Sequence, residues 1–310
     1  MRVVVALGGN ALLKRGEPMT AENQLANVRR AATALAPVLR QHQTVVTHGN
    51  GPQVGLLALQ AAAYGGASAF PLDVLGAESE GMIGYLIEQE LRNALGPQFS
   101  VAALLTQTVV DAHDPAFKNP TKPVGPVYER PEAERIAAER GWNVGADGSK
   151  FRRLVPSPEP REILEVRTIE ILMKAGIAVI SSGGGGIPVA QLPNGAYHRV
   201  EAVIDKDLAS ALLARELGAD ALVMLTDVTA VEVDHGTPSA RAIRVASPTA
   251  LSKLDFEAGS MGPKVAAAIG FVNETGGFAA IGRLEDVEAI LDGRRGTQVR
   301  VDARGVEFAP

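Results

Sequence analysis

The sequence predicts an α/β protein in which helices cover both faces of a mainly parallel sheet. Short apolar runs alternate along the chain with longer segments of helical periodicity, which is typical of repeated β-α-β units. Most of the apolar runs are continuous rather than alternating, as expected for strands that are buried on both faces. With 310 residues and 46% hydrophobic content, the chain can build the packed core that such a sheet requires.

Strands are expected wherever β-branched and other apolar residues cluster. The first run, VVVAL, begins near the start of the chain, and the second, TVVTH, ends directly before a glycine turn. The longest run is VAALLTQTVV. The runs span residues 3–7, 44–48, 101–110, 178–182, 221–228, 242–245, 278–281 and 297–301.

Helical patterns fill the gaps between these runs. The segment PQVGLLALQAAA follows the second run, and its Pro52 suits the first turn of a helix. Strands joined by helices in this way imply right-handed crossover connections. The helical segments are residues 21–41, 52–63, 77–95, 159–176, 205–217 and 263–275.

Residues 111–162 interrupt this rhythm with eight prolines. So many prolines oppose a regular element, and an insertion of this size is usually functional or disordered. Its hydrophobic residues could form a small satellite core, so we expect an ordered subdomain. These residues are Phe117, Val127, Tyr128, Trp142, Phe151 and Leu154.

The composition excludes several classes of function. The net charge of −5 argues against a nucleic-acid partner or an anionic membrane. The absence of Cys excludes disulfides, zinc ribbons and thiol catalysis, and it fits a reducing cytosol. The N-terminus does not resemble a secretory signal, and no stretch reaches the ~18 apolar residues of a membrane span. We therefore expect a cytoplasmic protein.

Three strands are followed by glycine turns: ALGGNAL (6–12), THGNGPQVG (47–55) and SSGGGGIPV (181–189). Parallel strands bring such turns to one edge of a sheet, where ligands bind. Backbone N–H groups of a glycine turn at a helix start form an anion site. Four consecutive glycines weaken the local structure, which indicates that something comes very close to the backbone there.

Familiar catalytic motifs are absent. The sequence has no GxxxxGK[ST], and GNGPQVG places its third glycine one residue too far along for GxGxxG, so P-loop and Rossmann proteins are disfavoured. Neither HExxH nor GxSxG occurs, and the five histidines show no ligand spacing. His48, beside the second glycine turn, either holds that turn or contacts the substrate.

Three lysines are candidates for binding an anion, because the chain uses Lys sparingly and Lys offers a compact, movable charge. Lys206 lies between Asp205 and Asp207 at a strand-to-helix junction, where a solvated charge cluster is the alternative. Lys264 opposes the dipole of the apolar helix that it begins, at a cost of roughly 0.3–1 kcal/mol that a bound anion would remove. Lys122 is fixed between two prolines of the insertion, a rigid setting that is unusual for a surface Lys, and a solvent-exposed role is the alternative.

Eight segments in order resemble the carbamate kinases of the amino-acid kinase family. They are LGGNAL, HGNGPQVG, FKNPTKPVGP, LVPSPEP, SGGGGIPV, EAVIDKDLAS, LTDV and GSMGPK, across residues 6–264. NPTKP and GGGGIPV distinguish this group from acetylglutamate, aspartate and uridylate kinases. Phe151 stands where the family often has Trp, a departure that concerns only packing within the insertion.

The resemblance implies a three-layer αβα sandwich around a mainly parallel open sheet, with a small protruding lid subdomain. The single domain, residues 1–310, would have an N-terminal lobe for carbamate or carbamoyl phosphate, about 1–180, with the lid at about 115–160. A C-terminal lobe, about 181–310, would hold the nucleotide. Members of the family are usually homodimers.

The resemblance also implies the reaction ATP + carbamate ⇌ ADP + carbamoyl phosphate, with Mg²⁺ bound mainly through the nucleotide phosphates. It usually runs toward ATP, after arginine breakdown. Because carbamate is already an anion, no general base is needed, and catalysis consists of positioning and electrostatic stabilisation.

The implied site residues fall into four groups. Backbone N–H groups would cradle the carbamate and phosphoryl oxygens at Gly8, Gly9, Asn10, Gly49, Asn50 and Gly51. Lys206 and Lys264 would contact the nucleotide phosphates and the transferring group, Lys122 would reach from the lid to the acyl phosphate, and Asp207 would orient the cations. Phosphate would pass close to Gly183, Gly184, Gly185 and Gly186, where a Cβ would occupy the space of its oxygens. The nucleotide base is expected near Thr226, Asp227, Val228, Met261 and Gly262.

Two other readings stay open. Another acyl-phosphate-forming kinase of the family would need a partner for the α-amino or side-chain groups of an amino acid, and NPTKP favours the smaller carbamate. A non-catalytic nucleotide- or anion-binding protein would be expected to have lost one of the three lysines, and all are present.

Overall fold

The computed structural model describes residues 1–14, 16–65, 70–257 and 261–309, with Asn10, Ala62, Gly65 and Pro126 described by their backbone alone. Its centre is a sheet in which ten strands are described, in the order β13-β14-β16-β15-β12-β1-β2-β9-β3, with β17 paired to β14. The strands are β1 (Arg2–Leu7), β2 (Gln43–His48), β3 (Val101–Ala103), β9 (Ala178–Ile180), β12 (Ala221–Thr226), β13 (Glu232–Val233), β14 (Arg241–Ala246), β15 (Phe278–Arg283), β16 (Thr297–Val299) and β17 (Val306–Phe308).

The central strands pair in parallel and are buried on both faces. β1 lies between β12 and β2, with Val3 opposite Ala221 on one side and Thr44 on the other. Val3, Val5 and Leu7 of β1 enter one core cluster, and Val4 and Ala6 enter the other. Among the described strands of this sheet, antiparallel pairing is confined to the C-terminal side, where β16 pairs with β15, and β13 and β17 pair with β14. The prediction of a mainly parallel, doubly covered sheet is confirmed.

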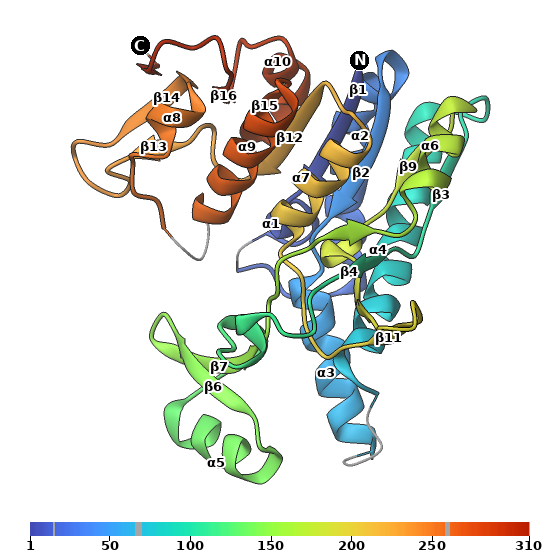
Figure 1. Ribbon diagram of the computed structural model, residues 1–310, viewed down its shortest axis with the longest axis vertical. Helices are drawn as coiled ribbons and strands as arrows, with labels where there is room; N and C mark the ends of the chain where they lie inside the picture. Colours follow the sequence, from blue (N-terminus) through green and yellow to red (C-terminus); the bar gives the residue numbers. More distant parts are fainter. Residues whose placement is uncertain (15, 66–69, 258–260, 310) are drawn as a thin grey trace.

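Helices cover the two faces of this sheet (Figure 1). One core cluster includes residues of α2 (Ala21–Gln41), α4 (Leu72–Leu95) and α10 (Val287–Leu291). The other includes residues of α6 (Val166–Lys174), α7 (Lys206–Glu216), α8 (Pro248–Leu251) and α9 (Met261–Thr275). The apolar face of each helix is thereby removed from water, which is the main stabilising term in such a sandwich.

Two sequence expectations need correction. The run 101–110 forms two strands, because the chain leaves the main sheet after β3 and enters a second sheet as β4 (Gln107–Val109). That sheet has the order β11-β10-β4-β8, with β8 (Glu162–Ile163), β10 (Ile187–Gln191) and β11 (Tyr197–Arg199). The segment 159–176 is helical only from Val166, because β8 takes its first part.

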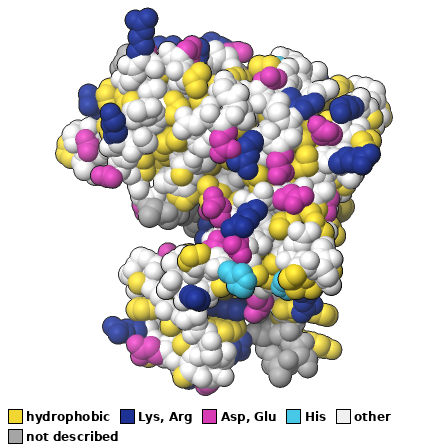
Figure 2. Space-filling model, viewed as in Figure 1, with side chains coloured by type: hydrophobic (Ala, Val, Ile, Leu, Met, Phe, Trp, Pro, Cys, Tyr) yellow, Lys and Arg dark blue, Asp and Glu magenta, His cyan; other side chains and the backbone are white. Residues whose placement is uncertain are grey.

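The proline-rich insertion is ordered. Its strands β5 (Lys122–Tyr128), β7 (Lys150–Val155) and β6 (Asn143–Asp147) form a three-stranded antiparallel sheet. With α5 (Arg130–Arg140), this small sheet lies apart from the main sheet. Figure 2 shows an indentation of the molecular surface between the two. The small sheet rests on α3 (Gly51–Gly65), where a Cβ on Gly55 would lie 2.9 Å from Cα of Gly125. Two glycines thus let the insertion approach the body of the protein closely.

The remaining short elements are α1 (Gly9–Leu12) and the 3₁₀ turns η2 (Pro115–Phe117), η3 (Gly183–Gly185) and η4 (Leu284–Asp286). α1 and α3 directly follow β1 and β2, so both begin at the carboxyl edge of the main sheet. Among the described helices, none combines the length and the apolar character needed to cross a membrane.

Candidate active site

A cavity of about 340 Å³ lies between the carboxyl edge of the main sheet and the small sheet. Its walls come from the turns after β1 and β2, from the start of α7 and of α9, and from β5. Three of the predicted lysines line it, Lys122, Lys206 and Lys264, although they are far apart in the sequence. The fold therefore brings the candidate cations to one place.

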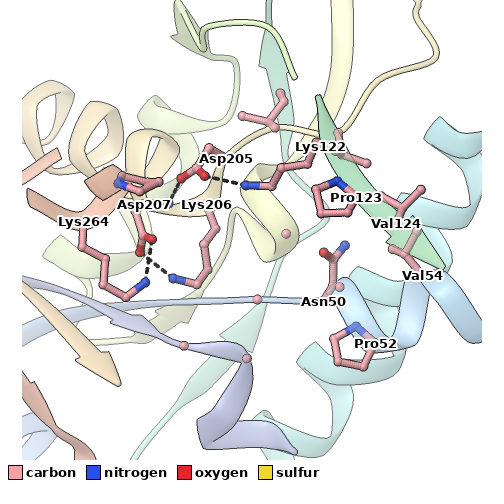
Figure 3. Close-up of a pocket in the computed structure, with 18 of the residues that line it drawn as sticks. Asn50, Pro52, Val54, Lys122, Pro123, Val124, Asp205, Lys206, Asp207 and Lys264 are labelled. Carbon is pink, nitrogen blue, oxygen red and sulfur yellow. Dashed lines mark hydrogen bonds and ion pairs between the residues drawn. The ribbon is translucent and has the colours of Figure 1, made fainter. Parts of the chain in front are cut away.

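Asp207 binds two of these lysines at once. Lys206 Nζ lies 2.5 Å from Asp207 Oδ1, and Lys264 Nζ lies 2.8 Å from Oδ2 (Figure 3). Lys206 and Asp207 lie in the first turn of α7, and Lys264 in the first turn of α9. These two helices pack side by side on the main sheet. The carboxylate thus holds two ammonium groups beside one another and offsets their repulsion.

Asp205 is the N-cap of α7 and also binds the third lysine. Its Oδ1 accepts hydrogen bonds from the backbone N–H of Asp207, at 2.9 Å, and of Leu208, at 3.3 Å. Its Oδ2 lies 2.6 Å from Lys122 Nζ, which reaches across from β5. One carboxylate therefore both starts the helix and joins the insertion to the body of the protein.

Asp207 is buried and the two lysine side chains on it are largely so, which shapes the protonation of the cluster. Burial lowers the pKa of Lys206, an effect that the adjacent Asp207 carboxylate counteracts. Burial would raise the pKa of Asp207, but the two ammonium groups lower it to about 2. Asp207 is consequently an anion at neutral pH, and its charge is what permits two cations to share a water-poor site.

The turns after β1 and β2 form the opposite wall. A Cβ on Gly8 would lie 2.7 Å from the carbonyl oxygen of Leu225, so this glycine is required by packing against β12. A Cβ on Gly9 or on Gly51 would meet no atom within 4 Å, and both glycines line the cavity. Gly49 packs against Gly9 and the Lys206 side chain. The backbone is therefore accessible to a small ligand at the start of α1 and of α3, where helix N–H groups attract anions.

The comparison with known proteins decides the family. A sequence profile of the amino acid kinase family matches residues 1–277.

The chain belongs to the amino acid kinase family.

Its similarity to individual members extends over the whole chain. A carbamate kinase of Haemophilus influenzae is 55% identical over 308 residues, covering 99% of both chains. A carbamate kinase of Rhizobium meliloti is 56% identical, covering 96% of this chain and 92% of that protein. Among solved structures, the carbamate kinase of Giardia lamblia bound to AMP-PNP superimposes with a TM-score of 0.89 at 41% identity, covering 96% of this chain and 98% of that one.

The four consecutive glycines, Gly183 to Gly186, are required for a different reason from the one expected from the sequence. Of the four, Gly184 lines the cavity. A Cβ on Gly183 would lie 2.5 Å from the His48 ring, one on Gly185 would lie 2.8 Å from Ile204 O, and one on Gly186 would lie 2.3 Å from Thr108 Oγ1. The steric argument from phosphate oxygens is wrong, because protein atoms fill the space. Positive φ angles at Gly184, Gly185 and Gly186 add a second reason for glycine.

His48 and Glu80 are buried behind this glycine turn. Burial lowers the pKa of His48 to about 4, and its Nδ1 lies 3.1 Å from the Gly49 carbonyl. Burial raises the pKa of Glu80 to about 8, against a hydrogen bond from the Thr106 N–H at 3.0 Å. Both groups are therefore neutral at pH 7. This burial favours the structural interpretation of His48, that it holds the turn.

The residues expected at the nucleotide base are divided between two cavities. Thr226 and Asp227, at the end of β12, line the central cavity. Val228 and Met261 line a neighbouring cavity of about 540 Å³. Gly262 donates its N–H to Glu257 O at 2.8 Å, and a Cβ there would lie 3.0 Å from the same oxygen. Asn10 lies in α1, and its side chain is outside the described part of the chain.

Sequence reasoning missed two polar residues of this site. The sequence motif marks Asp205 only as a neighbour of Lys206, although an Asp directly before a helical run is an N-cap signal that identifies it. Ser79 of α4 contacts Asn50, with Asn50 Nδ2 donating to Ser79 Oγ at 2.8 Å. No local pattern marks Ser79, because its role depends on how α4 packs against the turn after β2.

Proposed function

We propose that the protein is a carbamate kinase that catalyses ATP + carbamate ⇌ ADP + carbamoyl phosphate. The observation that carries this proposal is the convergence of Lys122, Lys206 and Lys264 on one cavity lined by glycine turns. The carbamate kinases that match the chain over nearly its full length support the same reaction.

The charge of the reactants explains why this arrangement suffices. Carbamate is an anion and needs no general base, so the protein must bring two anions together and stabilise the charge on the moving phosphoryl group. Lys206 and Lys264 provide two fixed positive charges for that group, and Asp207 keeps them in place. Lys122, which is more exposed than they are, would turn from Asp205 to the acyl phosphate. Backbone N–H groups of the turns after β1 and β2 would bind the carbamate oxygens.

The nucleotide would extend from the lysines toward β12. We place its phosphates beside Lys206, Lys264 and Thr226, and its base in the cavity lined by Val228 and Met261. In this arrangement the lobe of about residues 181–310 binds the nucleotide. The lobe of about residues 1–180, with its lid at about 115–160, binds the acyl substrate.

Mg²⁺ would enter the site with the nucleotide. Both oxygens of Asp207 and one of Asp205 already bind lysines, and within the described residues no group of three or more Asp, Glu, His or Cys could hold a metal ion. We therefore assign the metal ligands mainly to phosphate oxygens and water, with Asp227 among the residues of the cavity wall. When bound, the ion would neutralise charge on the phosphates.

We also propose that the protein forms a homodimer. Large apolar side chains are exposed on α4 and around the β10–β11 hairpin, at Tyr85, Leu192 and Tyr197. Such residues are enriched in subunit interfaces. Light scattering after size exclusion would show a mass of about twice 32.4 kDa, and a monomer would contradict the proposal. Cytoplasmic location and a role in arginine breakdown stay predictions from the sequence.

The activity is tested by ATP formation. The purified protein is mixed with ADP, Mg²⁺ and carbamoyl phosphate, and ATP is followed with luciferase, with acetyl phosphate as the comparison donor. We expect rapid ATP formation from carbamoyl phosphate and a much lower rate from acetyl phosphate. No ATP from carbamoyl phosphate would overturn the proposed function.

A further inference from the structure

The side-chain amide of Asn50 is held in one orientation by α4. Asn50 Nδ2 lies 2.8 Å from Ser79 Oγ, and Ser79 Oγ lies 2.7 Å from the carbonyl oxygen of Gly76. A hydroxyl has one proton, and this one is donated to Gly76, so Ser79 can only accept from Asn50. A reversed amide would place two acceptor oxygens against each other. The hydrogen bonds therefore fix the NH₂ group toward α4 and leave Oδ1 as the other end of the amide.

Gly184 provides the space in which this amide lies. A Cβ on Gly184 would be 2.0 Å from Asn50 Nδ2 and 2.3 Å from Oδ1, both far inside van der Waals contact. Gly184 also has φ +65°, a conformation that disfavours other residues. The second of the four consecutive glycines thus exists for Asn50, and any side chain there would displace the amide.

Asn50 lines the same cavity as Lys122 and Lys206. In Figure 3 its oxygen lies on the side facing these lysines, and its nitrogen points away from them. The turn after β2 therefore presents a neutral hydrogen-bond acceptor to a cavity that is lined by the three lysines and by Asp205, Asp207 and Asp227.

We propose that Asn50 Oδ1 accepts a hydrogen bond from the NH₂ group of carbamate and carbamoyl phosphate, and so selects them over acetate and acetyl phosphate. Ser79 and Gly184 are positioning residues that keep the acceptor end of the amide toward the substrate. This inference rests on the proposed function and adds the group by which the substrate is recognised.

The chemistry of the two acyl groups supports this role. Carbamoyl and acetyl phosphate have nearly the same shape and charge, and they differ in an NH₂ donor against a methyl group. The lysines and backbone N–H groups are donors, so they bind the oxygens of both compounds alike. The carboxylates of Asp205 and Asp207 also line the cavity, but their oxygens already bind lysines or cap α7. An acceptor fixed beside the acyl group would be left unpaired by a methyl group, which penalises acetyl phosphate by about tenfold or more.

The test compares the two donors in matched variants. For each protein, kcat/KM is measured with carbamoyl phosphate and with acetyl phosphate, and acetyl phosphate is assayed as a competitive inhibitor where its turnover is undetectable. We expect Asn50→Ala to reduce the preference for carbamoyl phosphate about tenfold, chiefly by loss of activity with that donor. Ser79→Ala and Gly184→Ala should reduce the same preference by a smaller factor, with the affinity for ADP unchanged.

Thr33→Val is the matched control for Ser79→Ala. Thr33 lies on the exposed side of α2 and donates to Arg29 O at 2.9 Å, so this variant also removes a hydroxyl that bonds to its own helix. Its preference should equal that of the wild type. Equal losses with both donors in Asn50→Ala and Ser79→Ala would overturn the inference, since general damage cannot change the ratio. A wild type that makes no ATP from either donor would overturn the proposed function instead.

Discussion

The two halves of the cavity are built in different ways. On the nucleotide side, Lys206 and Lys264 are held by Asp207, and their side chains are 14% and 13% exposed. On the acyl side, Lys122 comes from a separate small sheet, is 38% exposed and binds Asp205. Lys206 and Lys264 are anchored to two helices that pack together on the main sheet. The contact between Lys122 and Asp205 instead joins the small sheet to the body of the protein, and only a small hydrophobic cluster connects these two parts.

This difference implies a division of labour. Charges fixed by burial are suited to stabilising a transition state, because they need no reorganisation during the reaction. A half-exposed ion pair is worth little in stability and can be exchanged for a substrate oxygen. We therefore expect the buried pair to act mainly on the chemical step, and Lys122 mainly on binding of the acyl phosphate.

The largest effect is expected from the buried pair. Lys264→Met keeps the length of the side chain and removes its charge, and it should lower kcat by about 10²–10³-fold. Lys253, which is exposed on the surface, provides the control variant Lys253→Met, with unchanged kcat expected. A kcat for Lys264→Met within threefold of the wild type would show that the buried charge is dispensable.

A second contrast concerns pH, because the acyl side is supported by a neutral carboxyl group. The pKa of Glu80 is raised to about 8 by burial, with Glu165 adding a smaller effect in the same direction. The stability that the neutral form contributes is complete below the unfolded pKa of about 4.5 and is lost as the pH rises through about 8. The contribution of Glu80 to wild-type stability should therefore fall between about pH 4.5 and pH 8 and level off above that.

Glu80→Gln removes the titrating group and keeps an acceptor for the Thr106 N–H. Its free energy of unfolding, measured with urea at several pH values, should fall less over that range than the wild type's. Glu78→Gln, an exposed neighbour on the same helix, should follow the wild type. Parallel pH profiles for Glu80→Gln and the wild type would contradict the assignment of a neutral Glu80.

A smaller effect is expected from the lid lysine. Lys122→Met should raise KM for carbamoyl phosphate about tenfold, since one charged hydrogen bond is lost, and leave the Kd for ADP unchanged. Lys118→Met, an exposed neighbour in the insertion, should change neither. If Lys122→Met weakened the binding of ADP and of carbamoyl phosphate equally, the two halves of the cavity would not have separate functions.

The smallest effect concerns Asp205, whose two oxygens have separate tasks. Asp205→Asn keeps the N-cap of α7 and loses the charge that binds Lys122, so the stability should change by less than about 0.5 kcal/mol. Asp205→Ala loses the cap as well and should cost about 1 kcal/mol more. Urea unfolding of the two variants compares these costs, and equal destabilisation would mean that the cap contributes nothing.

The main sheet could be predicted from the sequence because its strands are continuous apolar runs, such as VVVAL in β1 and ALVMLT in β12. The split of residues 101–110 could not be predicted, because Leu104–Thr106 is as compatible with a strand as its neighbours. The second sheet exists because β10 is available to pair with β4, a contact that no local pattern specifies.

The candidate site shows the same limit. Lys206 and Lys264 were identifiable because cations are unusual at helix starts, whereas the role of Asp207 was implied only by the family resemblance. The need for glycine at positions 183 and 186 could not be predicted. It arises from contacts with His48, Glu80 and Thr108, which come from other parts of the chain. A glycine in a sequence indicates a close approach, and the structure is needed to show which group makes it.

The most direct test of the division between the two halves is the rate of the chemical step itself. Phosphoryl transfer from carbamoyl phosphate to ADP is measured in a single turnover by rapid quench, at saturating substrate, in Lys206→Met and in Lys122→Met. We predict that Lys206→Met slows this step by about 10²–10³-fold and that Lys122→Met stays within a few-fold of the wild type. Equal slowing of the chemical step in both variants would contradict the account.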